Sequence, residues 1–369
     1  RSRRQRQMCI RDRTFMNESG YTLYKTGSTP YRDLFASINL QADEVIFGRD
    51  YEASLSVLHN VQNYENSTTM GRPGMNKKIV NSYLMADGSR FTDKAGYETM
   101  TFDQECQNRD PRLAQTIRTP GYTRIGSTKK EAPNLAYTMT GYHLIKYSMT
   151  ANYDEYNKSC NDIPLFRTAE VYLNFAEAKA ELGTLKQADI NKSIKLLRDR
   201  VGMTNLDMEL ANSKPDPYLM SAATGYPNVK GANQGVILEI RRERTIELAM
   251  EGFRYYDIMR WKEGKLFEND LLGIYVPGPG TYDLDKDGTD DVCFYVGTKP
   301  AGNVPLYLEI GEQIRLSNGE SGYIICHSLI TKKWNEDRDY LYPVPISERT
   351  LSNGVITQNP GWNDGLNFN

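Results

Sequence analysis

The sequence predicts a mainly α fold, in which helix hairpins of the tetratricopeptide type are combined with long loops and a few short β-strands. Three observations lead to this prediction. The 369 residues are 39% hydrophobic and 25% charged, as is usual for globular proteins. Apolar residues recur at steps of three and four between residues 168 and 263, which indicates helices. Residues 14–160 lack such a period and are rich in turn signals.

The N-terminal residues 1–13 differ from the rest of the chain, because they contain six Arg and no apolar run. A signal peptide needs roughly 7–15 apolar residues after its basic start, so this stretch is not one, and Cys9 is not a lipidation site. We predict that residues 1–13 are a non-native scar or linker. Residues 14–369 then form the folded domain.

The polar composition and turn signals of residues 14–160 predict short helices and loops that pack on another part of the protein. Glu44–Phe47 is an apolar segment that indicates a short strand. Turn signals such as Gly71–Gly74 and Asp87-Gly88 follow it.

Two helices are predicted after residue 164. Thr168 is the expected N-cap of the first, which Gly183 ends, and Gly202 ends the second. The apolar positions that define them are Ala169, Tyr172, Leu173, Ala176 and Ala180, then Ile190, Ile194, Leu197 and Val201. Two helices joined by a few residues form an antiparallel hairpin, the unit of tetratricopeptide packing, although no clean repeat of that length is found.

A third helix is predicted from Gln234 to Glu263. Arg244, Glu247, Glu251 and Arg254 are spaced so that they share one face of it. We interpret this stripe as an ion-pair network that fixes the helix. The alternative is an acid/base pair of a glycoside hydrolase, formed by Glu247 and Glu251. Two Arg on the same stripe would keep both carboxylates ionised, and helix neighbours do not face each other across a scissile bond.

Several short motifs follow one another in a characteristic order. They are Val80–Tyr83, Asp87-Gly88, Asn108–Leu113, Thr140–Tyr142, Pro164–Arg167, Ala169–Ala178, Leu197–Arg200, Tyr340–Pro343 and Gln358–Trp362. The third helix adds Glu243, Arg244, Glu247, Leu248, Glu251, Gly252, Arg254, Asp257, Arg260 and Trp261. As an ordered set, these motifs resemble the SusD/RagB family of Bacteroidetes outer-membrane lipoproteins.

The resemblance implies a protein on the extracellular face of the outer membrane, held there by an N-terminal lipid. Such a protein binds oligosaccharides and delivers them to a SusC-like, TonB-dependent transporter. The resemblance implies no enzymatic activity and no required cofactor. The lipobox and first helices of the family are not found in this sequence, so we expect a SusD-like domain that lacks them. A peptide-binding or protein-binding adaptor of the tetratricopeptide type stays an alternative.

One acidic segment has the spacing of a calcium-binding loop. Asp283, Asp285, Asp287 and Asp291 occupy loop positions 1, 3, 5 and 9, and Thr289 could add a carbonyl at position 7. Phe294 stands at position 12, where such loops carry a bidentate Glu. The sequence therefore predicts either a weak structural calcium site or an acidic turn between two strands.

The predicted glycan surface lies in the segment from residue 51 to residue 83. Sugar rings place their C–H faces on aromatic rings and their hydroxyls on amides, and Tyr combines a flat apolar face with a polar tip. Both residue types alternate in this segment. The candidate residues are Tyr51, Asn60, Tyr64, Asn66 and Tyr83. Tyr83 could belong instead to a packing motif.

Other classes of function have little support. The net charge of −2 gives no basic field for nucleic acid. None of the three His lies in a recognisable catalytic motif, and no phosphate-binding Gly-rich loop occurs. The five Cys are widely spaced and form no CxxC pair, so a zinc or redox site is not indicated.

Overall fold

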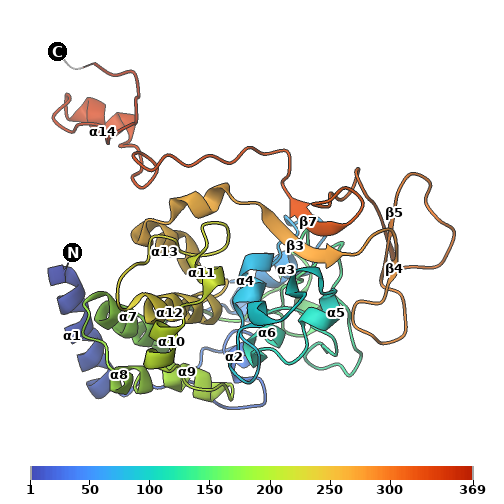
Figure 1. The fold of residues 1–369 in the computed structure, drawn as a ribbon, viewed down its shortest axis with the longest axis horizontal. Coiled ribbons are helices and arrows are strands. Elements are labelled where there is room, and N and C mark those ends of the chain that lie inside the picture. Colours follow the sequence, from blue (N-terminus) through green and yellow to red (C-terminus); the bar gives the residue numbers. More distant parts are fainter. Residues whose placement is uncertain (1, 368–369) are drawn as a thin grey trace.

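The computed structural model describes residues 2–367 and confirms the mainly α fold. Figure 1 shows α7 (Thr168–Glu181) and α12 (Gln234–Glu247) within the helical part of the molecule. The strands β4 and β5 lie at the opposite end. The C-terminal segment, with α14 (Ile346–Leu351), extends away from the body in this view (Figure 1).

The N-terminal helix α1 (Ser2–Glu18) lies along α7. Met8, Asp12 and Met16 follow one another at four-residue steps and are partly buried, and Met16 packs against the apolar core beneath α7. Residues 1–13 are predicted to be a scar or linker outside the folded domain, whereas most of them form part of this helix. Their origin as a scar or linker stays a prediction, because helical packing does not test it.

The predicted helix hairpin is present, with two differences. Arg167, not Thr168, is the N-cap of α7, and the Thr168 hydroxyl donates a hydrogen bond to the Glu44 carbonyl oxygen (3.1 Å). The second predicted helix is two helices, α8 (Gln187–Asn191) and α9 (Ile194–Arg200). They separate at Ser193, whose hydroxyl bonds back to the Asp189 carbonyl (2.8 Å). Such back-bonding competes with the helical hydrogen bonds and bends the chain.

The prediction of one long third helix is wrong. The segment forms α12 and α13 (Phe253–Trp261), separated by a turn in which Met250 and Gly252 have left-handed φ values of 64° and 83°. Glycine adopts that conformation without steric cost. The break directs α13 away from α12, so charges on the two segments cannot form one continuous stripe.

The remaining helices are short and belong mainly to residues 30–114. The α-helices are α2 (Pro30–Asp33), α3 (Val61–Glu65), α4 (Lys77–Ser82), α5 (Phe102–Glu105), α6 (Pro111–Ala114), α10 (Met208–Ser213) and α11 (Pro217–Met220). The 3₁₀-helices are η1 (Ala53–Leu55), η2 (Phe91–Asp93), η3 (Tyr97–Thr99), η4 (Ala151–Tyr153) and η5 (Gly264–Glu268). This arrangement agrees with the turn-rich sequence of that half.

Within residues 2–367, the strands form three small sheets. In the first, β1 (Val45–Arg49) pairs antiparallel with β2 (Ile163–Arg167), so the strand expected at Glu44–Phe47 is present with slightly different bounds. In the second, β3 (Leu271–Val276) pairs antiparallel with β7 (Gly322–Cys326). The third contains β4 (Gly280–Tyr282), β5 (Val292–Tyr295) and β6 (Leu306–Glu309), in that order.

Two large apolar clusters hold these elements together. One lies between α7, α9 and α12 and includes Leu173 and Leu238, both fully buried. The other joins α4 to the sheets and includes Tyr83 and Phe294. No helix within residues 2–367 is both long enough and apolar enough to span a membrane.

Candidate functional site

The first part of the predicted glycan surface is formed by α3 and by the loop that contains Asn157. Asn60 precedes α3, and its side-chain amide donates to Asn157 Oδ1 (3.0 Å), while the Asn157 backbone N–H donates to Asn60 Oδ1 (2.5 Å). Tyr64 lies one turn further along and is 49% exposed. Tyr156, which is not among the residues predicted from the sequence, is 66% exposed and precedes Asn157 in the chain.

Tyr51 contacts His59, whose backbone pairs with Ser159 in the loop that contains Asn157. The two rings meet edge to face at 4.3 Å, and the Arg49 guanidinium lies 5.1 Å from the Tyr51 ring centre. His59 Nδ1 accepts from the Val61 N–H (3.2 Å), and its Nε2 lies 2.9 Å from the Asn161 carbonyl oxygen. Burial lowers the pKa of His59, so this ring is neutral at pH 7 and holds its neighbours by uncharged hydrogen bonds.

We define the tyrosine surface as Tyr51, Asn60, Tyr64, Tyr156 and Asn157. It presents phenol rings and side-chain amides on a loop and a short helix. This is the combination of apolar faces and hydrogen-bonding edges that a sugar chain requires.

Two predicted residues do not belong to this surface. Tyr83 is fully buried in the core beside α4, and its hydroxyl donates to Thr116 Oγ1 (3.3 Å). Asn66 is 7% exposed, and its Oδ1 accepts from Arg118 (2.8 Å) and Arg124 (3.0 Å). Both side chains are therefore structural, and Tyr83 follows the packing interpretation that the sequence had left open.

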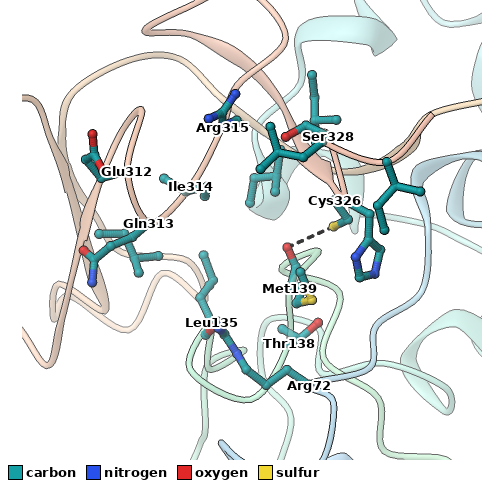
Figure 2. Close-up of a pocket in the computed structure, with 16 residues that line it drawn as sticks. Arg72, Leu135, Thr138, Met139, Glu312, Gln313, Ile314, Arg315, Cys326 and Ser328 are labelled. Carbon is teal, nitrogen blue, oxygen red and sulfur yellow. Dashed lines mark hydrogen bonds between the residues drawn. The ribbon is translucent and has the colours of Figure 1, made fainter.

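A pocket of about 380 Å³ lies beside β7 (Figure 2). It is bounded by the loops at residues 72, 135–139 and 312–315 and by residues 326–330. The Cys326 thiol lies 3.3 Å from the Met139 carbonyl oxygen, shown by the dashed line in Figure 2. Burial raises the pKa of Cys326 to about 11, so the thiol is protonated and unreactive at neutral pH. We call this space the Cys326 pocket.

The acidic loop connects β4 to β5, as expected for a turn between two strands. Asp283, Asp285 and Asp287 direct carboxylate oxygens to within 4.8 Å of one another, a spacing that suits a hard cation with several oxygen ligands. Asp291 instead accepts from the Leu284 N–H (2.7 Å), and burial followed by its acidic neighbours raises the pKa of Asp291 to about 6. Three of the five predicted ligands are thus brought together.

The carboxylates proposed for acid/base chemistry lie inside the protein. Glu247 Oε1 accepts from Arg167 (2.8 Å) and from Arg200, and its Oε2 accepts from Arg112 (3.1 Å). Burial raises the pKa of Glu247, but the three guanidinium groups outweigh it and hold the pKa well below the usual range. Glu251 is bound by Lys146 and Arg167. Neither carboxylate is accessible or basic enough to transfer a proton.

The ion pairs do not run along the helix as the sequence suggested. Arg244 pairs with Asp257 of α13 (2.7 Å), and Arg254 donates to the Thr245 hydroxyl (3.0 Å). Glu247 takes its partners from α6, β2 and α9. The structural interpretation of the stripe holds, but the charges connect distant segments and not successive helical turns.

Comparison with protein families gives one match over most of the chain. Residues 34–362 match the sequence profile of the SusD family. No curated protein sequence matches the chain.

Comparison with solved structures gives the same fold. One similar structure is a SusD-like protein from Bacteroides fragilis NCTC 9343, with 20% identity and a TM-score of 0.60 over 96% of this chain and 64% of that chain. Another is a SusD-like carbohydrate binding protein from the same organism, with 20% identity and a TM-score of 0.57 over 93% of this chain and 60% of that chain. This chain therefore spans less than two thirds of the length of either protein.

Proposed function

This chain belongs to the SusD family, and from that membership we propose that the protein binds oligosaccharides at the cell surface without cleaving them. The tyrosine surface is the observation that carries the proposal. The exposed rings of Tyr64 and Tyr156, beside the side-chain amides of Asn60 and Asn157, offer both kinds of contact that a sugar chain makes. One structure of the same fold is of a carbohydrate binding protein, which supports the same class of ligand.

Binding without catalysis is supported by the state of the acidic residues. The Glu247 and Glu251 side chains are 0% and 4% exposed, and both are bound by cationic side chains, so a hydrolase that uses this pair has no accessible acid or base.

We also propose that the whole protein delivers its ligand to a SusC-like, TonB-dependent transporter. The resemblance supports this partner, with attachment to the outer membrane by an N-terminal lipid. The helix hairpin of α7, α8 and α9 is the kind of element that binds protein partners in helical repeats. Co-purification of the full-length protein with a SusC-like transporter from the same organism would test the partnership, and a hairpin variant that still co-purifies would argue against this contact.

The acidic loop is proposed as a weak structural calcium site. Asp285 is 7% exposed, and burial together with the charges of Asp287 and Asp283 raises its pKa. The ionised form of Asp285 is therefore unfavourable, and a bound cation would stabilise it. The donor set, carboxylates at alternate positions of one loop, is the set that calcium takes. Calcium would then fix the β4–β5 connection and take no part in chemistry.

Affinity electrophoresis against neutral and acidic polysaccharides tests the main proposal. We expect one polysaccharide to retard the native chain and to be recovered uncut. The double substitution Tyr64→Ala, Tyr156→Ala should abolish this retardation. Tyr256→Ala is the matched control. Tyr256 is an exposed tyrosine too, at 64%, but it lies on α13, outside the tyrosine surface.

Three results would contradict the proposal. A shortened glycan would indicate an enzyme. Loss of polysaccharide binding in the Tyr256 variant alone would move the glycan site from the tyrosine surface to the groove between α1, α7 and α13. No retardation by any polysaccharide, from a folded chain, would remove the support for glycan capture.

A further inference from the structure

The walls of the Cys326 pocket carry positive charge that the protein does not neutralise. Arg72 and Arg315 both line the pocket, and among residues 2–367 no Asp or Glu forms an ion pair with either of them. Buried Arg167 and Arg112 are each paired with several carboxylates, whereas buried Arg109 bonds only to carbonyl oxygens. Within the described residues, the guanidinium charges of Arg72 and Arg315 are therefore not offset by an ion pair.

Arg72 is held in place by its surroundings. Its Nη2 donates to the Leu135 carbonyl oxygen (2.6 Å), and its own carbonyl oxygen accepts from the Met139 N–H (3.0 Å). Its backbone is left-handed, with φ of 50°, an unfavourable conformation for a residue with a side chain. Its Nε is buried without an acceptor. A buried donor without an acceptor is unfavourable, so a ligand oxygen that reached this guanidinium would remove an energetic cost.

The other walls of the pocket suit a sugar ring. Leu135, Met139 and Ile314 supply apolar surface, and Gln313 and Thr138 supply an amide and a hydroxyl. Figure 2 shows Arg72 and Leu135 on one side of the space, with Arg315 and Gln313 on other sides. A volume of about 380 Å³ lies within the range of small-molecule sites.

One acidic residue, Glu312, also lines the pocket. Figure 2 places it at the rim away from Arg72, and its side chain forms no ion pair with a described residue. Two guanidinium groups against one carboxylate leave the lining with an excess of positive charge. An anionic ligand is therefore favoured over a neutral or cationic one.

We propose that the Cys326 pocket binds an acidic sugar, a uronic acid residue of an oligosaccharide, with its carboxylate on Arg72. The planar guanidinium of Arg72 can form two parallel hydrogen bonds with a carboxylate. Arg315 would bind a second acidic sugar of the same oligosaccharide. The apolar walls contact the ring faces. The inference rests on the proposed glycan-binding function and adds the class of ligand.

The test uses two probes that differ only in charge. Calorimetric titration would compare trigalacturonate with its fully methyl-esterified form. We expect the acid to bind at least about ten-fold more tightly, because a charge-assisted pair contributes that much or more. This preference should shrink at high salt, since the pocket is open to solvent. Equal binding of acid and ester would overturn the proposal, as would tighter binding of a sulfated trisaccharide.

Two substitutions locate the effect. Arg72→Gln should remove most of the preference for the acid. Arg315→Gln, at an exposed position, should reduce this preference, and it keeps the test valid if the first variant unfolds. Lys192→Gln, at an exposed position beyond α8, is the matched control and should change nothing. A full preference in a folded Arg72→Gln, Arg315→Gln double variant would overturn the assignment.

The inference and the proposed function fail in different ways. If neutral polysaccharides are retained through the tyrosine surface while acid and ester bind equally, only the acidic-sugar assignment is lost. If no polysaccharide is retained in any assay, the proposed function is lost with it.

Discussion

The Arg167 guanidinium donates from Nη1 to Glu247 Oε1 at 2.8 Å, although the two residues lie 80 positions apart and both are buried. Arg167 ends β2 and Glu247 ends α12, so this pair ties a sheet to the central helix. Arg112 and Arg200 complete the shell around the same carboxylate. A buried charge of this kind is tolerated only while every partner is present.

Removing that carboxylate should therefore destabilise the protein strongly. We expect Glu247→Gln to lower the free energy of unfolding by about 3–5 kcal/mol, since three guanidinium groups lose a shared counter-charge. Urea denaturation measures the change. Lys195→Ala is the control, because it breaks an exposed pair with Asp199 that is worth about 0.5 kcal/mol or less. Similar losses in the two variants would contradict the structural role of the network.

Glu65 should make stability depend on pH in the opposite sense to a salt-bridged acid. Burial raises its pKa from 4.5 to about 7, against hydrogen bonds from the Ser148 hydroxyl and the Tyr147 N–H. Between these two values the folded state holds a proton that the unfolded state has lost. Its contribution is therefore fully present below pH 4.5 and is lost as pH rises through about 7.

The substitution Glu65→Gln isolates this contribution, since the amide does not titrate. We expect the variant to lose less stability than the native chain between pH 5 and pH 7, by about 1–3 kcal/mol. Urea denaturation at both pH values gives the difference. An unchanged pH dependence in the variant would show that Glu65 is ionised throughout.

The tyrosine surface should depend on its rings more than on its hydroxyls. We expect Tyr64→Ala to weaken glycan binding about ten-fold, because truncating an exposed aromatic contact removes roughly 1.4 kcal/mol. Tyr64→Phe should retain most of the affinity. Affinity electrophoresis at several polysaccharide concentrations measures both variants. If Tyr64→Phe weakened glycan binding as much as Tyr64→Ala, the hydroxyl and not the ring face would be the contact with the glycan.

Calcium should raise the melting temperature if the acidic loop binds it. At about 10 mM calcium, well above the dissociation constants of weak extracellular sites, we expect a rise of a few degrees that a chelator reverses. Asp285→Asn should abolish the rise. Asp290→Asn is the control in the same loop, because Asp290 is not among the clustered carboxylates. An equal response to magnesium would indicate screening of the acidic charge and not a calcium site.

Gly264 should not tolerate a side chain. A Cβ at this position would lie 2.0 Å from the Trp334 ring, so Gly264→Ala must displace the indole and the segment that carries it. We expect a loss of stability of about 1–3 kcal/mol with a change in tryptophan fluorescence. In a Trp334→Ala background the same substitution should cost much less. Additive losses in the double variant would show that the two positions do not compete for space.

The sequence determined the class of this protein because local patterns are enough for it. Apolar spacing indicated α7 and the helices that pack on it, and the ordered motifs led to the SusD family, which matches residues 34–362. The turn between β4 and β5 was also visible, because alternating carboxylates and a glycine specify a local conformation.

Only the tertiary structure decided which charges meet and which rings are exposed. Residues 44, 112, 167 and 247 come from distant segments, and their pairing depends on how those segments pack. Tyr64 and Tyr83 are both candidates in the sequence, yet one is 49% exposed and the other 0%. Exposure depends on which neighbours cover a side chain, and a local pattern carries no such information. The Cys326 pocket has the same origin, because its walls come from four separate parts of the chain.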